Sequence, residues 1–561
     1  MKARLSRRNN MEITRRTLLS ATTLAAAPGA AWARDLAAGV FTHGVASGDP
    51  LPDGVVLWTR FAARRGRRIA WEVSEDESFA RIAQRGGAVA SVSNDYCVKA
   101  DARGLAPGRR YFFRFLSASG PSVVGETRTA PAGAAGSLTV GLFSCANYAF
   151  GYFHAYGHAA EREDIDLVLH VGDYIYEYER GTYPSATDAL TERMIEPPHE
   201  TVRLADYYAR YATYHSDPDL MELRRAKPMS AVWDDHEIAN DAAARGAQNH
   251  QASEGGYADR IAAAAKAYFD WMPIRRPARR GVRLYRALDW GDLARIVLLD
   301  TRLIGRDRQL DYDTAIAGRL AQGGQEAAAA IRSFRDAELS DPRRTLLGAD
   351  QEAWLARTLG DSRERGQTWQ IVAQQVVVGD QRFPTGLSRL LAADAHANTR
   401  RWIAAGEAVG AQGLPWNLDA WGGYPAARAR FLRACAAHAS NAVVLGGDSH
   451  NCWLNNLAAP GESRLAAIEF AGGSVSSPGF ERVLSSAAPG ERESLMRAGN
   501  PELAWCDVTH RGYGVLRFTR NACEAEWNAF SDVRAPTFQP PAPMRFVSEP
   551  STVGPGPWTA S

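Results

Sequence analysis

Short apolar runs separated by turn residues fill the segment from Phe41 to about Ala130. Residues 55–60, 69–73 and 110–115 are rich in Val, Ile, Trp, Tyr and Phe, and Gly, Pro and Asp stand between such runs. This pattern is typical of short strands. It predicts a β-sandwich of roughly one hundred residues.

After Pro131 the pattern changes to continuous apolar runs that alternate with helical segments, such as residues 207–214 and 261–271. Because these runs show no polar alternation, they are expected to be strands covered on both faces. The strands predicted in this way are residues 138–143, 166–171, 228–233, 295–300, 369–373 and 442–445. Strands alternating with helices indicate an α/β fold with a layered core.

Three further segments are expected at the surface. The long insertions at about 180–225 and 303–345 are predicted to form loops and helices around the entrance of a site. The Pro-rich end, residues 536–561, is predicted to be an extended tail lying on the surface.

The N-terminus carries a pair of arginines, Arg15 and Arg16, followed by a weakly apolar run. Residues 31–33 read Ala-Trp-Ala, a small-x-small cleavage site. Together they indicate a twin-arginine signal over residues 1–33, although a basic N-terminus ahead of a first helix would also fit. The signal predicts a periplasmic or secreted protein, with the twin-arginine export machinery as a partner.

Composition narrows the classes of function. The 65 basic residues nearly cancel the 63 acidic ones, so neither a nucleic-acid-binding surface nor a basic membrane patch is expected. No apolar stretch of about 18 residues is present, and no integral membrane segment is predicted. The six cysteines are widely scattered, which leaves any disulfide pairing open.

Polar residues follow four of the predicted strands. The sequences are Ser-Cys-Ala-Asn at 144–147, Gly-Asp-Tyr-Ile-Tyr-Glu at 172–177, Asp-Asp-His-Glu at 234–237 and Gly-Gly-Asp-Ser-His at 446–450. Ligands gather at the carboxyl ends of strands in α/β sheets. A thiol, carboxylates, a phenol and imidazoles are therefore expected to converge on one edge.

These motifs, with residues 41–50, 56–60 and 419–425, resemble the PhoD-type alkaline phosphatases, relatives of the purple acid phosphatases among the calcineurin-like metallophosphoesterases. The resemblance covers nearly all of the mature chain. It implies a four-layer α/β/β/α metallophosphoesterase domain at residues 133–535. The N-terminal domain, residues 34–132, is expected to be a fibronectin type III-like β-sandwich.

The residue types also suggest which metals are bound. A thiolate and a phenolate suit a highly charged transition metal, whereas carboxylates suit hard divalent cations, so iron beside calcium is favoured over two zincs. The resemblance implies the same pair, Fe³⁺ and Ca²⁺. By motif matching, the iron ligands are Cys145, Asp173, Tyr176 and His450. The calcium ligands are Asp235 and Asp448, with Asp173 bridging both metals.

The other site residues have different expected roles. His236, next to Asp235, is predicted to stabilise the transition state or to protonate the leaving alkoxide, while water activated by the metals attacks phosphorus. One of Asp234 and Asp235 is expected to orient other ligands. Further candidates for metal binding or for orienting ligands are Asn147, Asp234, Asn240 and Gln375.

The resulting hypothesis is an exported phosphoric ester hydrolase of the alkaline phosphatase D type, acting on phosphate monoesters or diesters. A narrower alternative is a phosphodiesterase specific for nucleotides, phospholipid head groups or wall polymers. An alternative of another class is a secreted binding protein whose phosphoesterase-like domain is inert. The intact set of ligand-type residues favours the enzyme over the binding protein.

Overall fold

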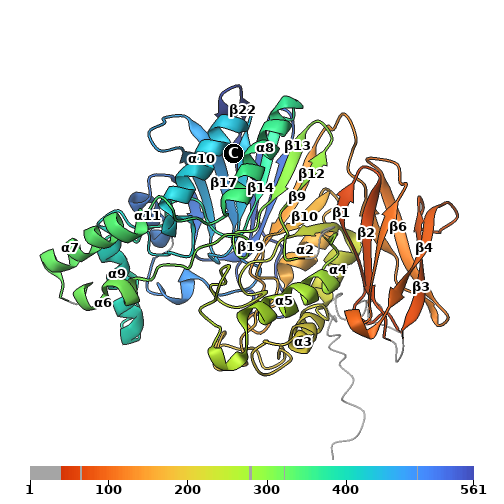
Figure 1. The fold of residues 1–561 in the computed structure, drawn as a ribbon, viewed down its shortest axis with the longest axis horizontal. Coiled ribbons are helices and arrows are strands. Elements are labelled where there is room, and N and C mark those ends of the chain that lie inside the picture. The colour runs from red at the N-terminus through yellow and green to blue at the C-terminus, as the bar shows by residue number, and fades with distance from the viewer. Residues whose placement is uncertain (1–39, 63–65, 277–280, 321, 489) are drawn as a thin grey trace, which may run out of the picture.

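Two large β-sheets form the centre of the molecule (Figure 1). The structure, a computed structural model, describes residues 40–62, 66–276, 281–320, 322–488 and 490–561. The predicted export signal, residues 1–33, lies outside the described residues.

The first sheet has ten strands. In spatial order they are β24 (Thr559–Ala560), β21 (Met544–Ser548), β20 (Cys523–Phe530), β19 (Arg511–Phe518), β9 (Leu138–Phe143), β10 (Leu167–His170), β11 (Pro228–Ala231), β1 (Val45–Leu51), β2 (Gly54–Arg60) and β5 (Cys97–Arg103). Strands β9, β10 and β11 are parallel, so Leu169 pairs with Leu142 on one side and with Ser230 on the other. Their carboxyl ends therefore meet at one edge.

The second sheet has seven strands. In spatial order they are β12 (Arg286–Trp290), β13 (Ala294–Leu298), β14 (Trp369–Ala373), β15 (Ala442–Gly446), β17 (Leu465–Gly472), β16 (Cys452–Ala458) and β18 (Leu503–Asp507). Strands β13, β14, β15 and β17 are parallel. All six strands predicted after Pro131 are thus present in the two sheets.

The two sheets pack face to face. Residues of both sheets share one hydrophobic cluster, which includes Leu142 and Phe470. Glycines allow this close approach: a Cβ at Gly472 would lie 2.7 Å from Leu142 Cδ2, and one at Gly514 would lie 2.6 Å from Phe470. Removing side-chain volume at these positions brings the carboxyl edges of the two sheets together.

Helices cover the outer faces of both sheets (Figure 1). Those beside the first sheet are α2 (His154–Glu161), α3 (Leu204–Tyr214), α4 (Pro218–Ala226) and α5 (Tyr257–Trp271). On the second sheet, α8 (Ala349–Glu364) and α10 (Pro425–His438) bury Leu355, Leu359 and Phe431 against β13, β14 and β15. The chain therefore has the predicted α/β architecture.

Local signals set the ends of these helices. Asp217 caps α4 by accepting the N–H of Leu220 at 3.0 Å, and Pro218 occupies the first turn. Helix α5 ends at Trp271 because Met272 precedes Pro273, which disfavours the helical conformation in the residue before it. A capping aspartate therefore sets the start of α4, and a proline sets the end of α5.

A third sheet completes the N-terminal domain. Its strands are β4 (Ile82–Ala90), β3 (Arg67–Ser74), β6 (Arg110–Ser117), β7 (Gly120–Pro121) and β8 (Gly125–Arg128). It packs against β1, β2 and β5, with Val45, Leu57 and Phe113 in the shared core. Because β1 also pairs in parallel with β11, this domain continues the ten-stranded sheet rather than standing apart.

The remaining helices are α6 (Tyr312–Leu320), α7 (Gly324–Phe334), α9 (Ala397–Gly410) and α11 (Glu491–Gly499). Helices α6, α7 and α9 project to one side of the molecule, and α6 and α7 arise from the predicted insertion at 303–345 (Figure 1). Within the described ranges, no helix combines the length and the hydropathy that a membrane span requires.

The C-terminal segment differs from the extended surface tail predicted from residue 536. Strand β21 pairs with β20, and β24 pairs with β21. Phe546 and Trp558 are buried, and Trp558 Nε1 donates to the Glu469 carbonyl at 3.0 Å. The Pro-rich composition of this segment gave no indication of these two buried aromatic residues. Their packing attaches the end of the chain to both sheets.

Candidate metal centre

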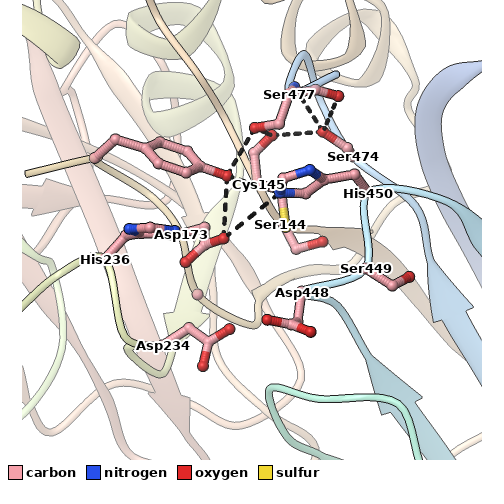
Figure 2. A network of polar contacts seen from close by, with 12 residues as sticks. Ser144, Cys145, Asp173, Asp234, His236, Asp448, Ser449, His450, Ser474 and Ser477 are labelled. Atoms are coloured by element: carbon pink, nitrogen blue, oxygen red, sulfur yellow. Dashed lines mark hydrogen bonds and ion pairs between the residues drawn. The ribbon is translucent and has the colours of Figure 1, made fainter. Parts of the chain in front are cut away.

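The predicted site residues lie just after four strand ends, where the two sheets face each other (Figure 2). Cys145 follows β9, Asp173 follows β10 and the Asp234–His236 motif follows β11, all in the first sheet. Asp448 and His450 follow β15 in the second sheet. Residues more than 300 positions apart in the sequence therefore reach one buried space.

The backbone at these positions is strained. Cys145, Asp173, Asp448 and His450 adopt left-handed conformations, with φ of 57°, 52°, 64° and 60°. Residues other than glycine rarely adopt φ above zero. At Gly172 the packing itself demands glycine, since a Cβ would lie 2.6 Å from the Asp234 nitrogen. Such strain clusters at functional sites.

One cluster joins a thiol, a carboxylate and an imidazole. Ligand atoms of Cys145, Asp173 and His450 all lie within 4.8 Å of one another. The Tyr176 hydroxyl donates to Asp173 Oδ2 at 3.0 Å and lies 3.1 Å from His450 Nε2. It also lies 2.7 Å from Ser477 Oγ. Tyr176, the fourth predicted iron ligand, thus contacts two members of this cluster.

Hydrogen bonding fixes the orientation of His450. Its Nδ1 lies 2.8 Å from the Pro478 carbonyl, which can only accept, so Nδ1 carries the proton. Nε2 then points its lone pair toward the cluster. Burial lowers the pKa of His450 to about 3, which keeps the ring neutral, as a metal ligand must be.

Carboxylates form two further overlapping clusters. Asp173 lies with Asp235 and His236, and Asp235 lies with Asp234 and Asp448. Burial raises the pKa of both Asp173 and Asp448 well above its usual range, and neighbouring aspartates add to the effect.

Two oxygen atoms of these carboxylates, Asp173 Oδ1 and Asp234 Oδ2, are buried without a hydrogen-bond partner. A third, Asp235 Oδ1, also lacks a hydrogen bond but lies 3.3 Å from the Arg302 guanidinium. An unpartnered buried carboxylate oxygen is costly unless a cation compensates it. The donor set therefore fits a pair of metal ions that share Asp173.

Arg302 supplies positive charge to the same carboxylates, and the sequence patterns did not single it out. Its side chain is fully buried and forms ion pairs with Asp234, with Asp419 at 2.8 Å and with both Asp235 and Asp448 at 3.3 Å. Arg302 follows the predicted strand at 295–300. Its position after a strand end is the same signal that indicated the other site residues, and it could have indicated Arg302 as well.

His236 is held by a buried carboxylate. Its Nδ1 lies 2.7 Å from Glu177 Oε2, and the other oxygen of Glu177 accepts from Asn240 N at 2.7 Å and from Asn249 Nδ2 at 3.0 Å. Burial opposes the charged ring, but Asp235, Glu177 and Asp173 together raise the pKa of His236 well above its usual range. Glu177 thus fixes the orientation of the imidazole beside the clusters.

The weaker candidates mostly have other partners. Asn147 Oδ1 accepts the N–H of Phe150 at 3.2 Å, and Asn240 Nδ2 donates to Gln248 at 3.1 Å. Gln375 Oε1 accepts from both the N–H and the hydroxyl of Thr301, at 3.0 and 2.7 Å. The oxygen of Gln375 therefore orients the loop that carries Arg302.

Comparison with known proteins places the chain in a family. The family model "PhoD-like phosphatase" matches residues 138–527, and the model of its N-terminal domain matches residues 25–131. Alkaline phosphatase D of Bacillus subtilis (strain 168) is 33% identical over 514 residues, which are 88% of this chain and 78% of that protein. A solved structure of PhoD matches with a TM-score of 0.75 and 31% identity, covering 93% of this chain and 92% of that one. The chain therefore belongs to the PhoD-like phosphatases, which are phosphoric ester hydrolases.

Proposed function

We propose that this protein is an exported alkaline phosphatase or phosphodiesterase that uses a ferric ion and calcium. The observation that carries the proposal is a chain of three overlapping ligand clusters: Asp173 belongs to the first two, and Asp235 joins the second to a third that contains Asp448. A carboxylate common to two clusters suits two cations held close together, the arrangement that favours displacement at phosphorus.

The donor atoms support a different metal in each cluster. Cys145, Tyr176 and His450 offer sulfur, phenol oxygen and nitrogen, which suit iron. Burial raises the pKa of both the Cys145 thiol and the Tyr176 phenol well above their usual ranges, so a highly charged cation is needed to deprotonate them. Asp235 and Asp448 offer only oxygen, which suits calcium.

The chain's own groups would position the ester and its leaving group. Bound in these clusters, the two cations supply charge to the phosphoryl oxygens and lower the pKa of a water. His236, held by Glu177, is assigned to protonating the leaving alkoxide or to donating a hydrogen bond to the phosphoryl group. Arg302 is assigned to compensating part of the negative charge of Asp235 and Asp448 from the side of the second sheet.

The domain and export assignments belong to the same proposal. They comprise a twin-arginine signal at 1–33, a fibronectin type III-like sandwich at 34–132, a four-layer α/β/β/α catalytic domain at 133–535 and a terminal segment at 536–561. The facing sheets with helices on their outer faces support the layering, and the strand order of the N-terminal domain supports the sandwich. The location is then the periplasm or the exterior of the cell.

Metal content and turnover test the proposal together. Protein purified from its exported form should contain iron and calcium, show a phenolate-to-iron absorption band and hydrolyse p-nitrophenyl phosphate. A calcium chelator should abolish turnover, and added Ca²⁺ should restore it. Colourless protein that contains only zinc and is fully active would contradict the metal assignment.

Substrate class is tested separately. Turnover of p-nitrophenyl phosphate and bis-p-nitrophenyl phosphate under one condition distinguishes a monoesterase from a phosphodiesterase. Activity on nucleotide, phospholipid or wall-polymer diesters alone would favour the specific phosphodiesterase. Absence of hydrolysis of every ester by metal-loaded protein would favour the inert binding protein.

A further inference from the structure

A hollow of about 720 Å³ lies beside the candidate metal centre. One wall comes from the loop that follows the Asp234–His236 motif, and the other comes from the loop that follows Arg302. Residues from both loops line it: Asp241, Arg245, Gln248, His250, Arg308 and Gln309. Both walls therefore start at residues of the site.

Asp241 links the hollow to the metal centre. Its backbone N–H donates to Asp235 Oδ2 at 2.7 Å, while the residue itself lines the hollow. It holds a left-handed conformation, with φ of 54°. The same residue thus lines the hollow and contacts a predicted calcium ligand, so the hollow adjoins the candidate metal centre.

The hollow has two arginines available for a ligand. Arg245 and Arg308 are exposed, and neither makes an ion pair with any carboxylate that the structure describes. The carboxylates that line the hollow belong to Asp241 and Asp311, and Asp311 accepts the N–H of Asp313 at 2.9 Å. The two guanidinium groups can therefore bind an anion.

A neutral acceptor belongs to another residue that lines the hollow. Gln309 Oε1 is buried and has no hydrogen-bond partner. Buried polar atoms are normally paired, so this oxygen needs a donor such as a hydroxyl group or a water. A ligand that carries both a hydroxyl and a negative charge could donate to Gln309 and pair with the arginines.

We infer that the hollow binds the alcohol portion of the ester, and that Arg245 and Arg308 select alcohols bearing a second anionic group. This inference rests on the proposed function, because it assumes that the phosphoryl group is bound at the metals. Guanidinium groups match the planar geometry of carboxylate and phosphate, which favours phosphate esters of hydroxy acids or of polyol phosphates.

Competitive inhibition of p-nitrophenyl phosphate hydrolysis tests this preference. Glycerol 3-phosphate and 3-phosphoglycerate differ at one carbon, which carries an alcohol in the first and a carboxylate in the second. The wild-type enzyme should bind 3-phosphoglycerate about tenfold more tightly, and the R245Q/R308Q variant should lose this preference. The variant's kcat for p-nitrophenyl phosphate should change by less than about twofold, because neither arginine contacts the reacting atoms.

Arg332→Gln, an exposed arginine on α7 outside the hollow, is the matched control and should leave both inhibition constants unchanged. Equal inhibition constants in the wild-type enzyme, or an equal loss for both compounds in the double variant, would overturn the inference. If the wild-type protein hydrolyses no phosphate ester, the proposed function fails instead. Calorimetric titration of the metal-loaded protein with the two compounds would then decide whether the hollow prefers the carboxylate.

Discussion

Replacing Arg302 with methionine would remove a guanidinium that contacts four carboxylates. Its side chain is fully buried, and Asp234, Asp235, Asp419 and Asp448 lie within 3.3 Å of it. Removing one partner of a buried ion pair leaves the other charges uncompensated. In chelated protein, we expect the free energy of unfolding to fall by about 3–5 kcal/mol.

Calcium should reverse part of this loss. A ligand that binds only the folded state stabilises it by RT ln(1 + [L]/Kd), or about 2.7 kcal/mol at one hundred times Kd. Without Arg302, the same carboxylates repel one another and hold calcium more tightly. The increase in unfolding free energy on adding Ca²⁺ should therefore be larger in Arg302→Met than in the wild-type protein.

Urea unfolding followed by tryptophan fluorescence, with chelator and with Ca²⁺, measures both quantities. Arg295→Met is the control, because the buried Arg295 side chain pairs with Asp289 at 2.7 Å and contacts none of the site residues. It should lower stability without changing the calcium increment. A loss below about 1 kcal/mol for Arg302→Met, or an increment equal to that of the wild-type protein, would refute the reasoning.

Four other changes have defined outcomes. Asp173→Asn should lower metal content and activity together, and unchanged metal content would rule out a shared ligand. His236→Ala should keep the metals and lower turnover about a hundredfold, less for nitrophenyl than for alkyl esters; loss of metal would make His236 a ligand. Burial raises the pKa of Glu469 from its ordinary 4.5 to about 7, so stability falls as pH rises from about 4.5 to 7 and levels off above that; Glu469→Gln should flatten the fall in urea midpoint over this range, and an unchanged slope would contradict this. Arg15→Lys with Arg16→Lys should retain the precursor in the cell, as shown by fractionation, and normal export would contradict the signal.

The strands could be predicted closely because their apolar runs end at polar turns. The predicted ranges 138–143 and 369–373 coincide with β9 and β14. Both strands are buried on their two faces, so nearly every residue is apolar and the ends are sharp. The α/β class followed from the alternation of such strands with helices.

Long-range partners could not be predicted in the same way. The sequence does not indicate that β1 of the N-terminal domain pairs with β11, or that the Pro-rich end supplies β21 and β24. Likewise, Glu177 stands beside Tyr176 in the sequence, but its role depends on His236, which lies 59 residues away. Such pairings are set by packing between distant segments rather than by local pattern.

The strained backbone at the strand ends explains how side chains from separate strands reach the same space. A left-handed conformation costs roughly 1–2 kcal/mol for a residue with a Cβ, and Cys145, Asp173, Asp448 and His450 all adopt it. Glycine at these positions would relieve the strain but would remove every donor atom. Each sharp turn instead aims a side chain from a strand end into the space between the sheets. The backbone strain at these four residues lowers the stability of the fold, and it is the cost of placing four metal-binding side chains around one space.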